Sequence, residues 1–324
     1  MLETTNKSIL VTGASGFIGS AVIRQLAEEY DVKGTVRQAV KVSYPWQMLH
    51  VDSMGENRRV EWAPVLHGTG VVIHAAGLAH LPRKDRRNTL HFFREVNTHG
   101  TLHLAEQAAA AGVDRFIYLS SIKVNGESSQ PEKPFRTEDR PNPSDYYAIS
   151  KMEAEEGLKK IAEQTGMEVV IIRPVLVYGP GVRANFLALM KWVAKGLPLP
   201  LGKALNLRSF VFVDNLVSLI RTCIVHPEAA GRTFLVSDGA DISTADLVRV
   251  MGKTLGKSPL ILPVSQFFLE SMASALGRRD SVQRLFGYLQ VDIEETKRLL
   301  NWRPPVSMEQ GLQQTAEHFM KGRI

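Results

Sequence analysis

The segment from residue 7 to residue 29 constrains the fold of this chain more than any other part of it. An apolar run over residues 9–11 predicts a buried strand, and apolar residues recur at helical spacing over residues 18–26. Between them stand three glycines at three-residue spacing, Gly13, Gly16 and Gly19. Glycines are common in ordinary turns, but a strand, a glycine turn and a helix in this order favour a dinucleotide phosphate site.

Each glycine has a physical role in such a turn. Gly13 permits the tight turn, Gly16 lets the backbone approach a pyrophosphate, and Gly19 lets the helix pack on the strand. The N–H groups and the dipole of the first helical turn favour phosphate charge. We therefore expect the cofactor to contact Gly13, Ser15, Gly16, Phe17, Ile18 and Gly19.

Composition and charge exclude several other classes. The 324 residues are 44% hydrophobic, which is enough for a full core, and the single cysteine, Cys223, allows no intramolecular disulfide. We see no signal peptide in the polar N-terminus and no uncharged apolar run of about 18 residues. We therefore expect a cytoplasmic protein with no integral membrane segment and no metal site.

The formal net charge of +6 is compatible with nucleic acid, a membrane surface or an anionic small substrate. The basic residues are scattered, and no basic stripe alternates with aromatic residues, so nucleic acid is not an expected partner. A small basic cluster at residues 83–87 is typical of a solvated loop.

Strand and helix signals alternate through the first half of the chain. Strands are predicted over residues 31–36, 46–51, 70–74, 116–120 and 168–173, and helices over 97–111 and from 146. This alternation predicts an α/β fold, a doubly wound parallel sheet of the Rossmann type with ligands at the carboxyl ends of its strands. We expect a dinucleotide-binding domain over residues 1–180. Residues 181–324 form mainly a smaller α/β substrate lobe, with some segments returning to the first domain and further strands over 233–237 and 259–264.

The second chemical signal is Tyr147 four residues before Lys151 on the predicted helix. Residues at this spacing project from one helix face, and an ammonium group lowers the pKa of a neighbouring phenol, which is ordinarily about 10. Ser120 and Ser121 end a predicted strand and supply a hydroxyl that can bond a carbonyl oxygen. The spacing alone also suits an ordinary amphipathic helix, so its position after the serine pair carries the prediction.

The chain resembles the extended short-chain dehydrogenase/reductases, the nucleotide-sugar branch of epimerases, 4,6-dehydratases and 4-ketoreductases. The resemblance rests on five motifs in the same order: residues 12–19, 74–77, 120–121, 147–151 and 173–180. It implies that Ser121, Tyr147 and Lys151 are catalytic, with Tyr147 as the acid or base at the sugar C4 oxygen and Ser121 bonding that oxygen. It also implies that the cofactor is bordered by Asp52, Ala75, Ala76, Gly77, Lys151, Pro174 and Val177.

Later segments are similar to a UDP-sugar site. Asn185 and Arg208 match diphosphate-binding positions, and Arg284 is a third candidate whose spacing drifts. The fork of an Arg side chain suits phosphate oxygens, and the alternative for each residue is a surface charge or a capping side chain, which is as good an explanation only for Arg284. His80 is placed to touch the sugar, with a surface or capping role as the alternative.

Two features narrow the reaction and the cofactor. The 4,6-dehydratases place an Asp-Glu pair after the catalytic hydroxyl residue, where this chain has Ile122 and Lys123, so dehydration is not expected. The second strand ends without an acid for the ribose 2′-hydroxyl, and Arg37 follows it. Arg37 suits a 2′-phosphate, which favours NADP(H) over NAD, although it can also stack on the adenine of either cofactor.

Three longer strings, at residues 120–127, 184–190 and 196–202, look like the UDP-N-acetyl-D-quinovosamine dehydrogenases. That resemblance implies NAD(P)H-dependent reduction of a UDP-4-keto-6-deoxy-N-acetylhexosamine at C4, in bacterial O-antigen and lipopolysaccharide synthesis. The alternative is a UDP-hexose 4-epimerase with the same triad, and a non-catalytic dinucleotide sensor is more remote. The resemblance also implies a homodimer.

Overall fold

The computed structural model describes residues 8–37, 46–51, 60–79, 89–265, 267–269 and 286–322. Three residues of the predicted site, Asp52, His80 and Arg284, lie outside the described residues. The single cysteine, Cys223, is buried. No helix in the described part of the chain is both long and apolar enough to cross a membrane.

The main sheet has seven strands in the order β3-β2-β1-β4-β5-β6-β9, and every neighbouring pair is parallel. Its strands are β1 (Ser8–Thr12), β2 (Val32–Val36), β3 (Gln47–His50), β4 (Thr69–His74), β5 (Arg115–Leu119), β6 (Glu168–Pro174) and β9 (Thr233–Val236). The order changes direction at β1, so the carboxyl ends of β1 and β4 flank the point where ligands bind in such sheets. The predicted Rossmann-type α/β fold is confirmed.

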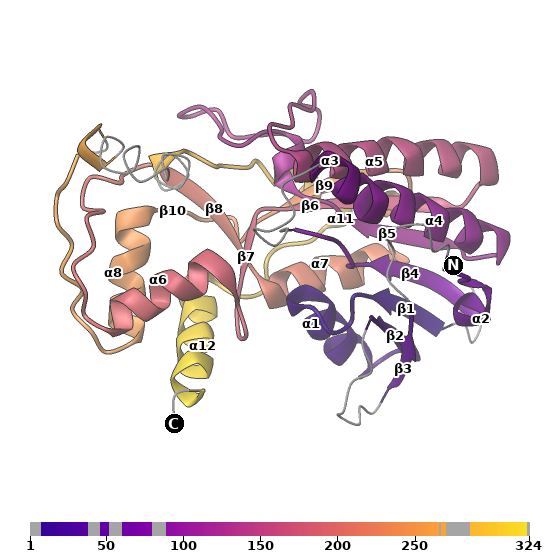
Figure 1. Ribbon diagram of the computed structural model, residues 1–324, viewed down its shortest axis with the longest axis horizontal. Coiled ribbons are helices and arrows are strands. Elements are labelled where there is room, and N and C mark those ends of the chain that lie inside the picture. The colour runs from indigo at the N-terminus through magenta and orange to yellow at the C-terminus, as the bar shows by residue number, and fades with distance from the viewer. Residues whose placement is uncertain are drawn as a thin grey trace.

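Helices cover both faces of the sheet (Figure 1). On one face α1 (Phe17–Leu26) contacts α7 (Val213–Val225), and on the other α4 (Gly100–Ala110) contacts α5 (Tyr146–Thr165). The two faces have separate apolar cores, because side chains of successive strand residues point to opposite sides. Shorter elements are α2 (Ala63–Leu66), η2 (Ile122–Val124), η3 (Pro227–Ala229) and α11 (Glu294–Leu300).

The helix before β5 begins earlier than its apolar pattern indicates. It runs without a break from α3 (Thr89–Phe93) through the π-helix η1 (Arg94–His99) into α4, whereas the prediction starts it at residue 97. A π-helix adds a residue to each turn and shifts the side chains that follow to another face. The 3.6-residue repeat of apolar residues can therefore be recognised only from the second half of η1 onward, where the predicted helix begins.

A smaller lobe occupies the left side of Figure 1. It contains a second sheet in the order β10-β8-β7, formed by β7 (Leu176–Tyr178), β8 (Leu207–Phe212) and β10 (Asp241–Ser243). The helices α6 (Ala184–Ala194), α8 (Thr244–Thr254) and α12 (Met308–Lys321) pack beside it. The predicted strand over 259–264 is wrong, because that segment has only an isolated bridge from Ile261 to Leu199.

Candidate active site

The glycine turn between β1 and α1 has the geometry of a phosphate cradle. Gly13 has a φ of +69°, and a Cβ built there would lie 2.9 Å from the backbone of Ala76. A Cβ on Gly19 would collide with the carbonyl of Gly13, so the helix lies directly against the turn. No side chain caps the N-terminus of α1 and its first turn has no acid. These features fit the pyrophosphate of a dinucleotide, which would meet the backbone N–H groups of this turn.

The carboxyl end of β4 is held by a buried chain of hydrogen bonds that the sequence did not predict. The Ala76 N–H donates to Thr12 Oγ1 at 3.3 Å, and Thr12 Oγ1 lies 2.7 Å from Nδ1 of His74. On the other side His74 Nε2 lies 2.9 Å from Thr101 Oγ1, which donates to the carbonyl of Asn97 at 2.7 Å. Burial, with a contribution from Lys151, lowers the pKa of His74 to about 3. The imidazole is therefore neutral and orients the predicted cofactor segment Ala75–Gly77.

Asn97, in the π-helix, connects this segment to α5. Its amide accepts from Leu78 N at 2.8 Å and donates to Leu78 O at 3.0 Å and to Ser150 Oγ at 3.0 Å. Ser150 in turn donates to the carbonyl of Tyr147 at 2.7 Å. Because a π-turn redirects one side chain, Asn97 was not recognisable from helical spacing.

The structure brings the three predicted catalytic residues together. The side chains of Ser121 and Tyr147 are hydrogen-bonded, and the ring of Phe93 packs against Tyr147 with centroids 6.2 Å apart. Lys151 is buried, and its Nζ donates to the carbonyl of Leu119 at 2.9 Å. A Cβ built on Gly77 would lie 3.3 Å from Lys151 Nζ, so this ammonium adjoins the predicted cofactor segment.

The pKa of Tyr147 differs from the expectation that Lys151 lowers it. Burial raises the pKa of Tyr147 to about 12, the bond with Ser121 opposes this rise, and the charge of Asp145 adds to it. The expected lowering of the Tyr147 pKa by Lys151 is not found, because the ammonium is directed to the Leu119 carbonyl and lies over the ring of Tyr118. Burial lowers the pKa of Lys151 to about 8, opposed by the charge of Glu155. At pH 7 the pair therefore holds a neutral phenol and a cation.

A buried ion pair behind the triad separates the roles of the two serines. Ser120 donates to Glu155 Oε1 at 2.5 Å, and Arg173 binds the same carboxylate through Nε at 2.9 Å and through a terminal nitrogen at 2.5 Å. Another Arg173 nitrogen donates to Asn125 Oδ1 at 2.9 Å. Ser120 is thus a structural neighbour, and Ser121 is the hydroxyl that faces Tyr147.

Lys123 occupies one of the two positions where dehydratases have acids, and it is engaged elsewhere. Its Nζ lies 2.6 Å from Asp145 Oδ2 and 3.1 Å from Glu127 Oε2. The other oxygen of Asp145 caps α5 by accepting from Ala148 N at 2.8 Å. Lys123 therefore ties the segment after Ser121 to the start of the helix that carries Tyr147.

The remaining predicted residues lie in different settings. Arg37 is exposed directly after β2, with its carbonyl 3.0 Å from His50 Nε2. Pro174 is buried at the end of β6, and Val177 is half-buried in β7. Asn185 is exposed in the first turn of α6. Arg208 in β8 donates to Gly287 O at 2.8 Å, and burial lowers its pKa to about 10.

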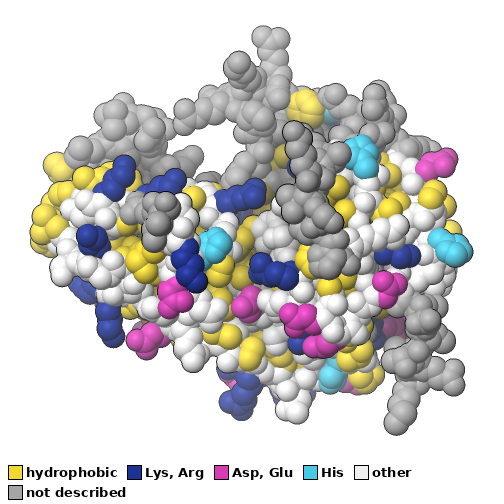
Figure 2. Space-filling model, turned by 90° about the horizontal axis from the view of Figure 1, so that it is seen from below, with side chains coloured by type: hydrophobic (Ala, Val, Ile, Leu, Met, Phe, Trp, Pro, Cys, Tyr) yellow, Lys and Arg dark blue, Asp and Glu magenta, His cyan; other side chains and the backbone are white. Residues whose placement is uncertain are grey.

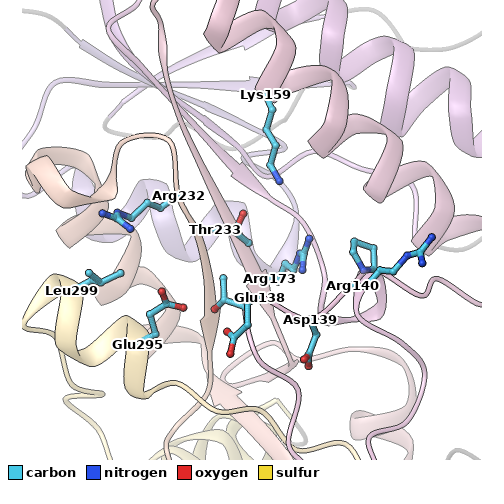
Figure 3. Close-up of a pocket in the computed structure, with 11 residues that line it drawn as sticks. Glu138, Asp139, Arg140, Lys159, Arg173, Arg232, Thr233, Glu295 and Leu299 are labelled. Carbon is cyan, nitrogen blue, oxygen red and sulfur yellow. The ribbon is translucent and has the colours of Figure 1, made fainter.

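A pocket of about 320 Å³ lies away from these residues (Figure 3). It opens between the loop over residues 137–141, α5 and α11, and charged side chains of both signs line it, among them Lys159, Arg232 and Glu295. Arg173 reaches this pocket, but its guanidinium is bound to Glu155. No residue of the predicted site lines the pocket, so we assign it no part in the chemistry.

Comparisons with known proteins agree with this geometry. Residues 9–237 match the profile of the NAD dependent epimerase/dehydratase family. A UDP-glucose 4-epimerase from Vibrio cholerae is 46% identical over 97% of this chain and 96% of its own length. A GDP-6-deoxy-D-mannose reductase from Pseudomonas aeruginosa is 27% identical over 94% of each chain.

Solved structures share the fold across the whole chain. The UDP-glucose 4-epimerase of Thermotoga maritima, crystallised with UDP-glucose, superposes with a TM-score of 0.77 at 24% identity, covering 98% of this chain and 100% of that one. The UDP-glucuronic acid 4-epimerase of Bacillus cereus, in complex with NAD, superposes with a TM-score of 0.78 at 22% identity, covering 98% of this chain and 100% of that one. At such identities the likeness concerns the fold.

Proposed function

Because the chain belongs to the NAD dependent epimerase/dehydratase family, we propose that it is a UDP-hexose 4-epimerase that inverts the configuration at C4 of the sugar. The observation that carries this proposal is the 46% identity to a UDP-glucose 4-epimerase over nearly the full length of both chains. The Ser121–Tyr147 bond, with Lys151 one helical turn away, supplies the acid–base group that such a reaction needs at O4.

The side chains have distinct tasks in this proposal. Tyr147 first has to lose its own proton; as a phenolate it accepts the proton of the C4 hydroxyl, and it then returns that proton to the same oxygen. Ser121 bonds that oxygen and orients it toward the phenol. Lys151, whose Nζ adjoins the segment Ala75–Gly77, helps to hold the dinucleotide there. The glycine turn and the segment Ala75–Gly77 hold the dinucleotide, and NAD, when bound, supplies the hydride acceptor and donor.

The discriminating experiment incubates purified protein in parallel with UDP-glucose, UDP-N-acetylglucosamine and a UDP-4-keto-6-deoxy sugar. UDP-glucose is incubated without added reductant, and formation of UDP-galactose is followed by proton NMR. Conversion without net consumption of NADH or NADPH supports the epimerase. No conversion of UDP-glucose or of UDP-N-acetylglucosamine, together with oxidation of NAD(P)H by a UDP-4-keto-6-deoxy sugar, refutes it.

The second candidate is the 4-ketoreductase that the longer sequence strings indicated. The observation that favours it is the end of β2, where the exposed Arg37 stands in place of an acid. A guanidinium there suits the 2′-phosphate of NADPH, and a reductase exchanges its cofactor at each turnover. In this proposal Tyr147 donates its proton to the C4 oxygen, for which a neutral phenol at pH 7 is the required form.

Arg37→Ala separates the two cofactors. If Arg37 binds the 2′-phosphate, the variant loses at least tenfold in affinity for NADPH and changes little for NADH. If the affinities for NADPH and NADH fall equally, Arg37 contacts the adenine that both cofactors share. Fluorescence titration with each cofactor measures the two dissociation constants.

A further inference from the structure

Two stretches of sequence that lie mainly in the smaller lobe carry positive charge without any negative charge. The sequence contains no Asp or Glu between Glu168 and Asp214, and none between Asp246 and Glu270. Acid-free stretches about as long as the second one also occur at residues 4–27 and 62–84, so the first stretch is the distinctive one. A stretch as long as the first one without an acid is unusual, because proteins generally mix the two signs on solvated faces.

Parts of these two stretches lie side by side along one end of the molecule, drawn at the left of Figure 1. Leu199 N donates to Leu260 O at 2.9 Å, and Leu262 N donates to Leu199 O at 2.8 Å. Ile261 packs against the core between two leucines that point outward. In an edge segment of this kind the outward positions are ordinarily polar, whereas here they are leucines.

The outward apolar side chains form a group. Leu205 is 65% exposed, Leu260 55% and Trp192 48%, and Leu197 and Leu262 are also exposed. Leu197 N donates to the carbonyl of Trp192 at 3.3 Å, which joins the end of α6 to the group. We call these five residues, together with the lysines named next, the basic apolar surface. Such a concentration of exposed Leu and Trp marks an interaction site.

Four exposed lysines stand within three residues of one of these apolar side chains along the chain: Lys191, Lys195, Lys203 and Lys257. None of the four has an ion-pair partner within the described part of the chain. Lys253, at the margin, does pair with Glu309 at 3.6 Å. Figure 2 shows apolar and basic side chains together at this end of the molecule.

We propose that the basic apolar surface docks this protein onto an anionic lipid bilayer. Trp and Leu side chains enter the boundary between headgroups and acyl chains, while lysine ammonium groups remain among the phosphates. The same charge opposes a second copy of this chain on the same surface, because the lysines of the two copies would face one another. The inference is independent of the reaction assigned above.

The test is sedimentation of the purified full chain with vesicles. The expected result is binding to vesicles of 70% phosphatidylcholine and 30% phosphatidylglycerol at 0.1 M NaCl, and loss of binding to pure phosphatidylcholine or at 0.5 M NaCl. Lys195→Gln/Lys257→Gln should weaken binding about fivefold for each lysine removed. Trp192→Ser/Leu260→Ser should weaken it at least tenfold.

Matched controls distinguish this surface from net charge and general hydrophobicity. Lys159→Gln/Lys160→Gln on α5 removes the same charge elsewhere, and Val225→Ser removes an apolar side chain that is 60% exposed at the end of α7. Both controls should bind vesicles as the unaltered protein does. The proposal is overturned if the unaltered protein does not sediment with the anionic vesicles, or if the controls weaken binding as much as the surface variants. It is also overturned if Trp192→Ser/Leu260→Ser dissociates an oligomer in light scattering without changing vesicle binding.

Discussion

Glu155→Gln tests whether the buried ion pair behind the triad sets the charge of Lys151. The side chains of Glu155 and Arg173 are 3% and 4% exposed, and two guanidinium bonds join them. Removing one partner of such a pair leaves a buried charge uncompensated, which costs about 3–5 kcal/mol. The amide oxygen of Gln can still accept one of the two bonds, so we expect a loss near the lower end, about 3 kcal/mol.

The same substitution should change the pH dependence of catalysis. The charge of Glu155 opposes the fall in the pKa of Lys151, which lies at about 8. Without that charge the pKa falls further, so Lys151 loses its proton at lower pH. The alkaline limb of kcat/KM should therefore move to lower pH in Glu155→Gln. Urea unfolding and a kcat/KM profile between pH 6 and pH 9.5 measure the two effects.

Glu168→Gln is the matched control, because Glu168 also pairs with a buried arginine, Arg115. Glu168 is 38% exposed, and Arg115 keeps three backbone carbonyl acceptors when the carboxylate is removed. The free energy of unfolding should therefore fall by about 1 kcal/mol or less. Its pH profile should match that of the unaltered protein. The reasoning fails if Glu155→Gln keeps the original alkaline limb of kcat/KM. It also fails if the free energy of unfolding of the variant lies within about 1 kcal/mol of that of the unaltered protein. Adding Arg173→Met to Glu155→Gln should recover part of the stability, because the unpaired charge is then removed.

Three further predictions concern the site itself. Tyr147→Phe should lower kcat by about 10²- to 10⁴-fold, while calorimetric titration gives an unchanged affinity for the cofactor. Gly13→Ala should abolish cofactor binding with the circular dichroism spectrum retained, because the φ of +69° and the nearby Ala76 backbone leave no room for a methyl group; undiminished binding would contradict the assigned cradle. Asp145→Asn keeps a helix cap but removes the charge that raises the pKa of Tyr147. The kinetic limb assigned to Tyr147 should therefore move to lower pH, and a limb that stays in place would exclude this electrostatic role.

The strands and the glycine turn were predictable because their signals are local. All seven strands of the main sheet were predicted, most of them from apolar runs and β3 from a weaker signal, and the helical spacing after Gly19 located α1. The second sheet was not foreseen, because β7 and β10 have three residues each and little pattern develops over such a length. The helix through η1 was predicted to start too late, because a π-turn breaks the 3.6-residue repeat.

The sequence by itself identified Tyr147 and Lys151, because four residues on a helix place two side chains on one face whatever surrounds them. The tertiary structure decided what charges those groups carry, since burial and partners from distant segments set proton affinity. Glu155 and Arg173 lie on different elements, as do His74 and Thr101, and no local spacing relates the members of either pair. The tertiary structure also decided which serine bonds Tyr147. Glu155 binds the hydroxyl of Ser120, whereas the hydroxyl of Ser121 bonds Tyr147.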